Sequence, residues 1–235
     1  IDLTITDQGK VSGKLRVVGR SLPFSGNISA YGKAILNVPA SAMPGYFRCQ
    51  PNWQVVFDLD TSGNSEQVTG GYVWDQQTFA SAIVLERVRP GSITEPSPYL
   101  GNYTLALSPG TNTSQPQGWG HATVKVSLTG VASIAGSLAD GTPFTHAAPV
   151  IARNGLHPIY ATPYLDKGWL YGWLQFQPGN PAGDLQGPLV WRKNGPQPGK
   201  PYPNGFELAP RVTGSRYTAP SATQRILNFA EGVVA

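Results

Sequence analysis

Two pairs of matching segments constrain the fold of this chain more than any single residue does. Residues 3–15 (LTITDQGKVSGKL) match residues 124–138 (VKVSLTGVASIAGSL), and residues 68–74 (VTGGYVW) match residues 185–191 (LQGPLVW). The repeating unit is therefore about half of the chain, which indicates a duplicated module rather than the short turn of a solenoid. The matched positions are mainly glycine and apolar residues, so the repeat describes a scaffold and not a site.

Polar and apolar residues alternate along many short segments, and helical periodicity is nearly absent. This pattern is typical of strands that bury one face. Pairs such as Asp140-Gly141 and Asn154-Gly155 separate the segments and tolerate the positive φ of hairpin turns. The predicted fold is all-β: an internally duplicated antiparallel meander whose two barrel-like or sandwich-like halves are related by pseudo-twofold symmetry. We expect strands within residues 2–6, 11–17, 53–60, 78–89, 103–108, 122–129, 144–152 and 169–176.

The turn-rich and proline-rich stretches divide the chain into two units. We expect a first β unit at residues 1–89, a joint at 90–99 that contains three prolines, and a second β unit at 100–195. Residues 196–223 begin with the sequence PQPGKPYPN and are predicted to be a stiff, proline-rich linker. Residues 224–235 (QRILNFAEGVVA) read as an extra strand or as the start of a further module.

The charge of the chain is modest and dispersed. The 17 basic and 13 acidic residues give a net charge of +4, and the basic residues form no run longer than Arg192–Lys193. Proteins that bind nucleic acid usually gather their basic residues in one patch, so we expect no nucleic-acid partner. The sequence also lacks a run of 18 apolar residues, so we expect no membrane span.

The segment WLYGWLQF at residues 169–176 carries the most suggestive side chains. On a strand, Trp169, Tyr171 and Trp173 project from one face, at intervals of roughly 6.6–6.8 Å between residues two apart. Such a row of rings can stack on the sugar rings of a polysaccharide. The alternative is that both faces of the strand are covered, one by a barrel core and one by the partner unit, because aromatic side chains dominate core burial.

A polar stretch after the strand at 53–60 resembles the first half of a calcium-binding loop. Asp58, Asp60, Ser62 and Glu66 place oxygen ligands in a spacing that suits Ca²⁺. Position twelve of that pattern is Thr69, however, so the bidentate carboxylate is missing. An ordinary polar hairpin turn is the alternative, and we expect no other metal or cofactor.

Motifs for catalysis are missing from the sequence, and we assign no catalytic residue. His121, His146 and His157 have no metal-ligand spacing and are expected to be polar residues on a strand or at a rim. No Gly-x-Ser-x-Gly nucleophile elbow occurs. A glycoside hydrolase would need two carboxylates paired across strands, which the sequence alone does not reveal.

Several motifs recur in a familiar order: residues 136–144 (GSLADGTPF), 158–161 (PIYA), 172–176 (GWLQF) and 185–191 (LQGPLVW). Together they resemble a β-rich module near the C-termini of very large secreted or surface-attached bacterial proteins. Residues 225–229 (RILNF) resemble the start of the segment that follows that module. The family carries no catalytic residues to transfer. The resemblance implies an extracellular or cell-surface location, with other domains of a parent protein as partners.

The expected function is therefore a non-enzymatic structural or adhesive module of a large extracellular bacterial protein. The first alternative is a carbohydrate-binding module that uses Trp169, Tyr171 and Trp173. The second is a carbohydrate-active hydrolase whose site is not visible in the sequence.

Overall fold

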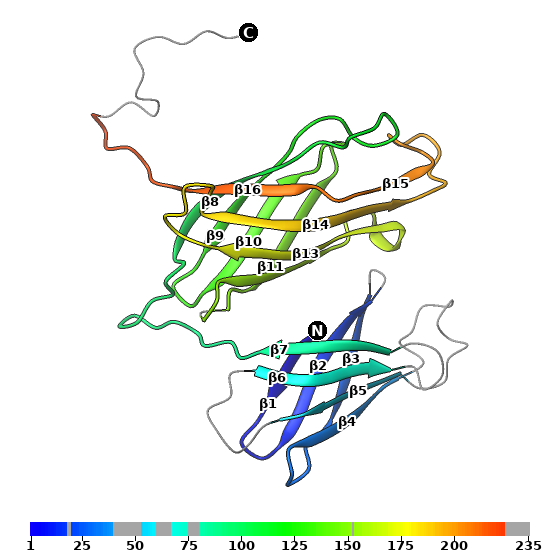
Figure 1. Ribbon diagram of the computed structural model, residues 1–235, viewed down its shortest axis with the longest axis vertical. Coiled ribbons are helices and arrows are strands. Elements are labelled where there is room, and N and C mark those ends of the chain that lie inside the picture. The colour runs from blue at the N-terminus through cyan, green and yellow to red at the C-terminus, as the bar shows by residue number, and fades with distance from the viewer. Residues whose placement is uncertain (18–19, 40–52, 60–66, 75–79, 152, 224–235) are drawn as a thin grey trace.

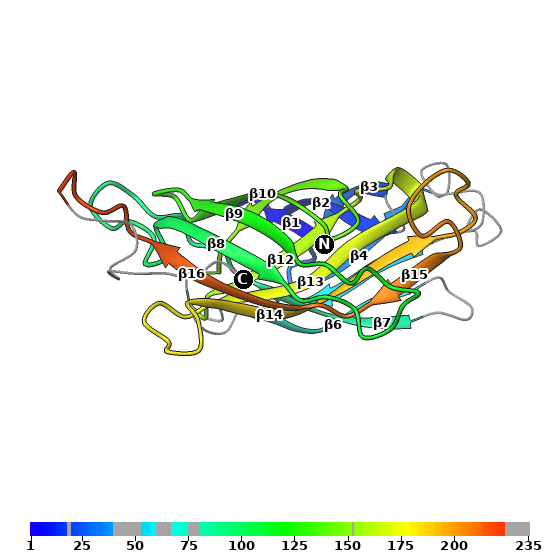
Figure 2. The same ribbon diagram turned by 90° about the horizontal axis from the view of Figure 1, so that it is seen from above.

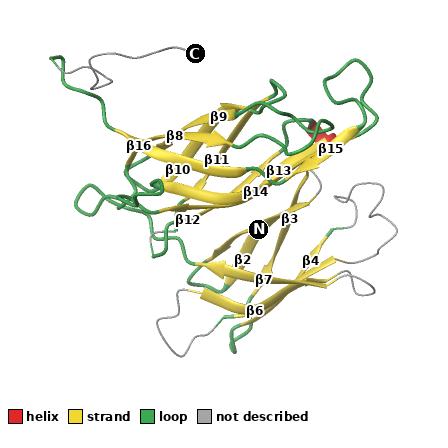
Figure 3. Ribbon diagram, turned by 45° about the horizontal axis from the view of Figure 1, so that its top comes forward, coloured by secondary structure: helices red, strands yellow, loops and turns green. Residues whose placement is uncertain are grey.

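The computed structural model describes residues 1–17, 20–39, 53–59, 67–74, 80–151 and 153–223. Within these residues the fold is all-β, as predicted, and a three-residue 3-10 helix at Leu165–Lys167 is the one helical element (Figure 3). None of the described segments forms a helix that has both the length and the apolar character to cross a membrane. The strands fall into an N-terminal unit 1 and a C-terminal unit 2 (Figure 1).

Unit 1 consists of two antiparallel sheets, with strand orders β1-β2-β3 and β4-β5-β6-β7. The inward residues of both sheets share one core, which includes Leu22, Leu36 and Phe57, each 1% exposed. Unit 1 is therefore a small sandwich-like body. Its strands are β1 (Asp2–Ile5), β2 (Lys10–Val17), β3 (Arg20–Asn27), β4 (Lys33–Val38), β5 (Trp53–Asp58), β6 (Gln67–Trp74) and β7 (Ala80–Glu86).

Unit 2 is a single nine-stranded antiparallel sheet that curls into a nearly closed barrel. The order is β11-β10-β9-β8-β16-β14-β13-β12, and β15 pairs with one end of β14. Its core holds Trp191, Tyr103 and Phe176, each 2% exposed or less. The strands are β8 (Gly101–Leu107), β9 (Gly120–Val126), β10 (Val131–Ser137), β11 (Pro143–Pro149), β12 (Leu156–Ala161), β13 (Gly168–Phe176), β14 (Leu185–Asn194), β15 (Gly205–Leu208) and β16 (Arg211–Tyr217).

The alternation in the sequence matches the burial of the strands. Along β9, the four residues from Gly120 to Val126 that point inward are buried and the three between them are exposed. On β13, Leu170 and Leu174 are fully buried, as expected for the face opposite the aromatic row. Burial of one face of each strand stabilises the folded state by about 25 cal/mol for each Å² of apolar surface that leaves water. The core is therefore the main source of stability.

Residues 196–223 are not the linker that the prolines predict. This stretch contains β15 and β16, and β16 lies between β14 and β8 as an integral strand of the barrel (Figure 2). The alternation Val212-Thr213-Gly214-Ser215 buries Val212 at 1% exposure and brings Gly214 close to Leu105. The prolines lie mainly in the loop that precedes these strands, where they break no backbone ladder.

The chain enters and leaves unit 2 at the same end of one strand pair. Asn102 at the start of β8 is opposite Tyr217 at the end of β16, and Val212 is opposite Leu107 at the other end. Arg216 holds this end together. Its guanidinium Nη2 donates to the carbonyl of Leu100 at 2.6 Å, and its backbone N donates to Asp184 Oδ2 at 2.7 Å.

The seam between β11 and β12 closes the barrel without a backbone ladder among the described residues. Pro149 and Pro158 lie along this seam, and proline has no N–H to donate. Imidazole rings take the place of the missing donors: His146 Nε2 donates to Pro158 O at 2.8 Å, and His157 Nδ1 lies 3.3 Å from Pro149 O. Side-chain hydrogen bonds therefore help to close the barrel where a backbone ladder is missing.

Among the described residues, an ion pair joins the two units. Arg153 Nη2, in the β11–β12 loop of unit 2, lies 3.0 and 2.9 Å from the two carboxylate oxygens of Glu86 at the end of β7. The Glu86 side chain is 9% exposed and that of Arg153 is 48% exposed. The two units are therefore connected by this ion pair as well as by the joint at residues 90–99.

Candidate functional site

The aromatic row lies on the outer surface of unit 2 and is open to solvent. Tyr171 is 42% exposed and Trp173 is 46% exposed, while Trp169 is half-buried. The Arg192 guanidinium carbon lies 5.7 Å from the centre of the Trp169 ring, a cation–π contact that holds this indole against the sheet. The predicted common face of the three side chains is confirmed. Their complete burial, the alternative that the sequence left open, is wrong for Tyr171 and Trp173.

Neighbouring strands extend this row into a patch. Tyr160 of β12 is opposite Tyr171, and Pro158 of β12 is opposite Trp173. On the other side, β14 places Val190 opposite Tyr171. We call the four aromatic residues Tyr160, Trp169, Tyr171 and Trp173 the aromatic face. The sequence did not predict that Tyr160 belongs to it, because membership depends on the β12–β13 register rather than on spacing along one strand.

One end of the aromatic face is bordered by charged side chains. Arg192, opposite Trp169, forms an ion pair of 3.5 Å with Glu207 of β15, and both side chains are about half exposed or more. The opposite end carries Trp173 between proline-bearing strands. A ligand that stacks on Tyr171 and Trp173 therefore meets apolar rings first, with hydrogen-bonding groups available beside Trp169.

A second outer surface of unit 2 is a shallow groove of about 870 Å³ over strands β8 to β11. Short hydroxyl side chains line it in a lateral row, because Thr104 is opposite Thr123, Thr123 opposite Ala135, and Ala135 opposite Thr145. Lys125 is the one cation among the residues that line it. We call this surface the hydroxyl groove.

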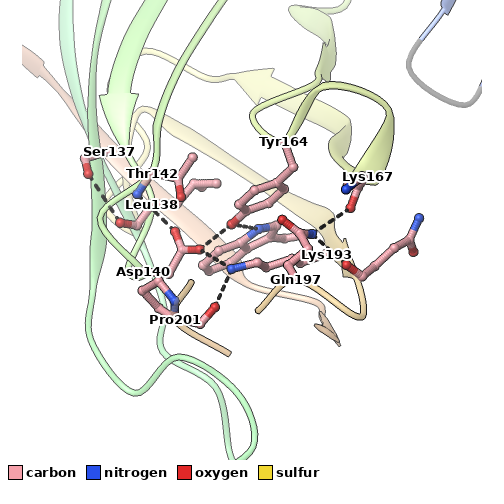
Figure 4. A network of polar contacts seen from close by, with 11 residues as sticks. Ser137, Leu138, Asp140, Thr142, Tyr164, Lys167, Lys193, Gln197 and Pro201 are labelled. Atoms are coloured by element: carbon pink, nitrogen blue, oxygen red, sulfur yellow. Dashed lines mark hydrogen bonds and ion pairs between the residues drawn. The ribbon is translucent and has the colours of Figure 1, made fainter. Parts of the chain in front are cut away.

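A cluster of buried polar groups closes one end of the barrel (Figure 4). Asp140 accepts hydrogen bonds from the Tyr164 hydroxyl at 2.6 Å and from Thr142 N at 3.0 Å. Its Oδ2 lies 3.7 Å from Lys193 Nζ, and the two side chains are 0% and 2% exposed. Lys193 also donates to the carbonyl of Pro201. The cluster ties the β10–β11 turn and the 196–204 loop to β14.

The buried position of this cluster indicates that it stabilises the fold. Burial, and then the hydrogen bond to Asp140, raise the pKa of Tyr164 well above its ordinary value, so the phenol stays protonated and donates. Trp191 Nε1 donates to the same hydroxyl at 3.1 Å. Because the charged groups have almost no accessible surface, a substrate has no route to them in this arrangement.

All three histidines lie on strands, one of the two positions that we expected, and two of them, His146 of β11 and His157 of β12, have rings on the inner side of the barrel. His157 is 0% exposed and packs against His146, with ring centres 5.6 Å apart. Burial, and then the neighbouring His146, lower the pKa of His157 to about 4. Burial also lowers the pKa of His146. Both rings are therefore neutral near pH 7, and they serve the β11–β12 seam. His121 is exposed on β9.

The calcium prediction falls largely outside the described residues. Asp58 is the exposed last residue of β5, whereas Asp60, Ser62 and Glu66 lie in the stretch that the structure does not describe. Elsewhere in the described chain, His, Cys, Asp and Glu side chains form no group of three that could hold a metal ion.

Several carboxylates already have partners. Asp2 pairs with Arg16 at 2.6 Å, and the partners of Glu86, Asp140, Asp184 and Glu207 are given above. Each of these five faces a basic group or a backbone amide. The hydrolase alternative gains no support from them.

The chain matches no protein-family model, and no curated protein or solved structure resembles it at a significant level.

Proposed function

We propose that this chain is a non-enzymatic adhesive module of a large extracellular bacterial protein, and that it adheres by binding polysaccharide on its aromatic face. The observation that carries the proposal is the exposure of Tyr171 and Trp173, 42% and 46%, side by side on the outside of a rigid barrel. A soluble domain usually hides large aromatic side chains, so two open rings on one strand call for a ligand.

The chemistry of the aromatic face suits a sugar chain better than a charged ligand. Sugar rings have apolar faces that bury surface against an aromatic ring, and their hydroxyls require polar partners at the edge. Arg192 and Glu207 supply a donor and an acceptor next to Trp169. Among the residues that the structure describes, no cluster of cations on this face would favour an anionic polymer.

The strand that carries the rings is well supported from below. Leu170 and Leu174 alternate with Tyr171 and Trp173 and are fully buried in the barrel core. The two rings are therefore held on a strand whose backbone is paired on both sides, by β12 and β14. Such preorganisation reduces the entropy that binding would otherwise cost.

Binding to a panel of insoluble polysaccharides tests the proposal. We expect at least one polysaccharide to retain the chain, and Trp173→Ala and Tyr171→Ala each to weaken that binding about tenfold or more, which equals about 1.4 kcal/mol. Trp119→Ala is the matched control, since Trp119 is 64% exposed but lies in the loop before β9. Thr123→Val in the hydroxyl groove tests the competing surface.

The proposal fails if no polysaccharide binds, or if binding survives both substitutions on the aromatic face. Loss of binding in Thr123→Val alone would assign the ligand to the hydroxyl groove instead.

We also propose that the two units arose by duplication of one meander. Equivalent backbone hydrogen bonds support this: the N–H of Gly9 donates to Thr6 and that of Gly130 to Ser127, both at 2.9 Å. The N–H of Ile28 donates to Gly9 and that of Val150 to Gly130, both at 2.8 Å. An experimental structure in which β1–β6 cannot be superimposed on β9–β14 would contradict the duplication.

A further inference from the structure

Unit 1 has two strand edges that no described strand covers. β1 pairs only with β2, and β7 pairs only with β6, among the residues that the structure describes. An unpaired edge exposes a row of N–H and C=O groups that can bind another strand. Proline and lysine are two of the residues that block natural strand edges, and neither occurs in β1 (DLTI) or β7 (ASAIVLE).

The core of unit 1 is also incomplete between these edges. Leu3 and Ile5 of β1 and Ile83 and Leu85 of β7 point toward the core but are only partly buried. The inward apolar side chains described on β2 to β5 are nearly inaccessible, as Val11 of β2 shows at 2% exposure. Apolar surface is therefore left uncovered along both open edges.

Unit 2 shows what fills the equivalent position. β8 lies between β16 and β9 and pairs antiparallel with both. Its inward residues Tyr103, Leu105 and Leu107 are 1%, 6% and 3% exposed, and the Tyr103 ring packs edge-on against Phe176 at 5.1 Å. β9 carries the sequence that matches β1. The strand that seals β9 in unit 2 has no described counterpart in unit 1.

We propose that unit 1 is a strand acceptor: a separate polypeptide segment inserts between β7 and β1, antiparallel to both. The occupant has the chemistry of β8, which means about seven residues with large apolar side chains at alternate positions and uncharged residues between them. Its backbone pairs with the two free edges, and its apolar side chains cover Leu3, Ile5, Ile83 and Leu85. Strand addition of this kind derives affinity from main-chain hydrogen bonds and specificity from the alternate side chains. This inference does not depend on polysaccharide binding.

An added strand on the full chain tests the acceptor. Residues 99–119, which contain β8 and its connection to β9, are placed once more ahead of Ile1. We expect the amide protons of β1 and β7 to exchange at least about tenfold more slowly, and the lowest thermal transition to rise by at least about 5 °C. The control carries Tyr103→Asp and Leu105→Asp in the added copy only, so that its inward face is charged.

Synthetic peptides then test donation by a separate molecule. We expect a peptide of residues 99–108 to bind the unmodified chain saturably, and the same peptide with Tyr103→Asp and Leu105→Asp not to bind. A peptide of residues 224–235 is the second arm, and its binding would identify a second copy of this chain as one donor. The proposal is overturned if the two extended chains show equal amide exchange and equal thermal transitions, or if the 99–108 peptide binds no better than its charged variant.

Discussion

Single residues in the buried polar cluster contribute to stability in a way that surface charges do not. Lys193 and Asp140 are both almost inaccessible, so neither can be solvated if the other is lost. A buried ion that loses its partner costs far more than the net value of the pair. Arg192, the preceding residue in the sequence, makes the contrasting case with its exposed partner Glu207.

We predict that Lys193→Met lowers the free energy of unfolding by about 3–5 kcal/mol, because the Asp140 carboxylate stays buried without its cation. Arg192→Met is the matched control and should cost less than about 1 kcal/mol, since that pair is exposed. Urea unfolding followed by tryptophan fluorescence measures both. Equal costs for the two variants would show that the cluster does not depend on its charge.

His157 makes the stability of unit 2 depend on pH. The pKa of this ring is about 4 in the folded chain and 6.5 when it is unperturbed, so the unfolded chain binds the proton more readily. Its stabilising contribution is therefore complete above about pH 6.5 and is lost as the pH falls toward 4. Between pH 7 and pH 5 we expect a loss of about 2 kcal/mol in the free energy of unfolding.

The substitution His157→Phe should flatten this dependence, because the ring no longer titrates. His146, whose pKa burial also lowers, leaves a smaller slope of the same sign. Urea unfolding of both proteins at pH 7 and pH 5 makes the comparison. If the free energy of unfolding changes with pH equally in His157→Phe and in the unmodified chain, a group other than His157 causes the pH dependence.

At the scale of elements, the conformation of β13 between its two exposed rings depends on one glycine. Gly172 lies between Tyr171 and Trp173 and has φ +150°, and a Cβ on it would lie 2.6 Å from the carbonyl of Pro188. Only glycine tolerates both conditions without displacing β14. The spacing of the two exposed rings therefore depends on a residue that has no side chain.

We predict that Gly172→Ala costs about 1–3 kcal/mol of stability and also weakens polysaccharide binding, because β13 must move away from β14. Gly118→Ala is the control, since its Cβ would make only ordinary contacts at 3.8 Å or more. Thermal unfolding and retention on the polysaccharide measure the two effects. If the polysaccharide retains Gly172→Ala as well as the unmodified chain, binding by the two rings does not depend on the geometry of β13 at Gly172.

The elements also show how far the sequence can be interpreted. Alternation alone placed Leu170 and Leu174 inside and Tyr171 and Trp173 outside, because side chains on a strand point to opposite faces in turn. It could not place Tyr160 beside Tyr171, which requires the register of a second strand. It missed β16 because this strand contains glycine and follows a proline-rich stretch. Its pairing partner β8 lies about a hundred residues earlier in the chain.

At the scale of the whole molecule, the two units differ in completeness. The barrel of unit 2 encloses Tyr103, Leu105 and Leu107 on the strand that seals it. Unit 1 leaves Leu3 and Leu85 partly exposed at its open edges. Among the described residues, Glu86 of unit 1 bonds to Arg153 and Asn154 of unit 2, and each unit has a hydrophobic core of its own.

We therefore predict two thermal transitions in calorimetry, with unit 1 unfolding first. A shorter chain of residues 90–223 should retain the upper transition at nearly the same temperature, because unit 2 has its own core. Each transition should show equal calorimetric and van't Hoff enthalpies. A single transition for the full chain would mean that the two units are energetically one body.

The place where the chain enters and leaves unit 2 has a mechanical consequence. Because Asn102 is opposite Tyr217, tension between the joint and the C-terminal end acts on the same end of the β8–β16 pair. The interstrand bonds then peel apart one after another instead of sharing the load in shear. Arg216, which bonds to Leu100, holds this end, and the N–H groups of Gly91 and Ser97 attach the joint to unit 2 ahead of it by donating to the carbonyls of Thr129 and Leu128. We expect a module loaded in this way to yield gradually under pulling.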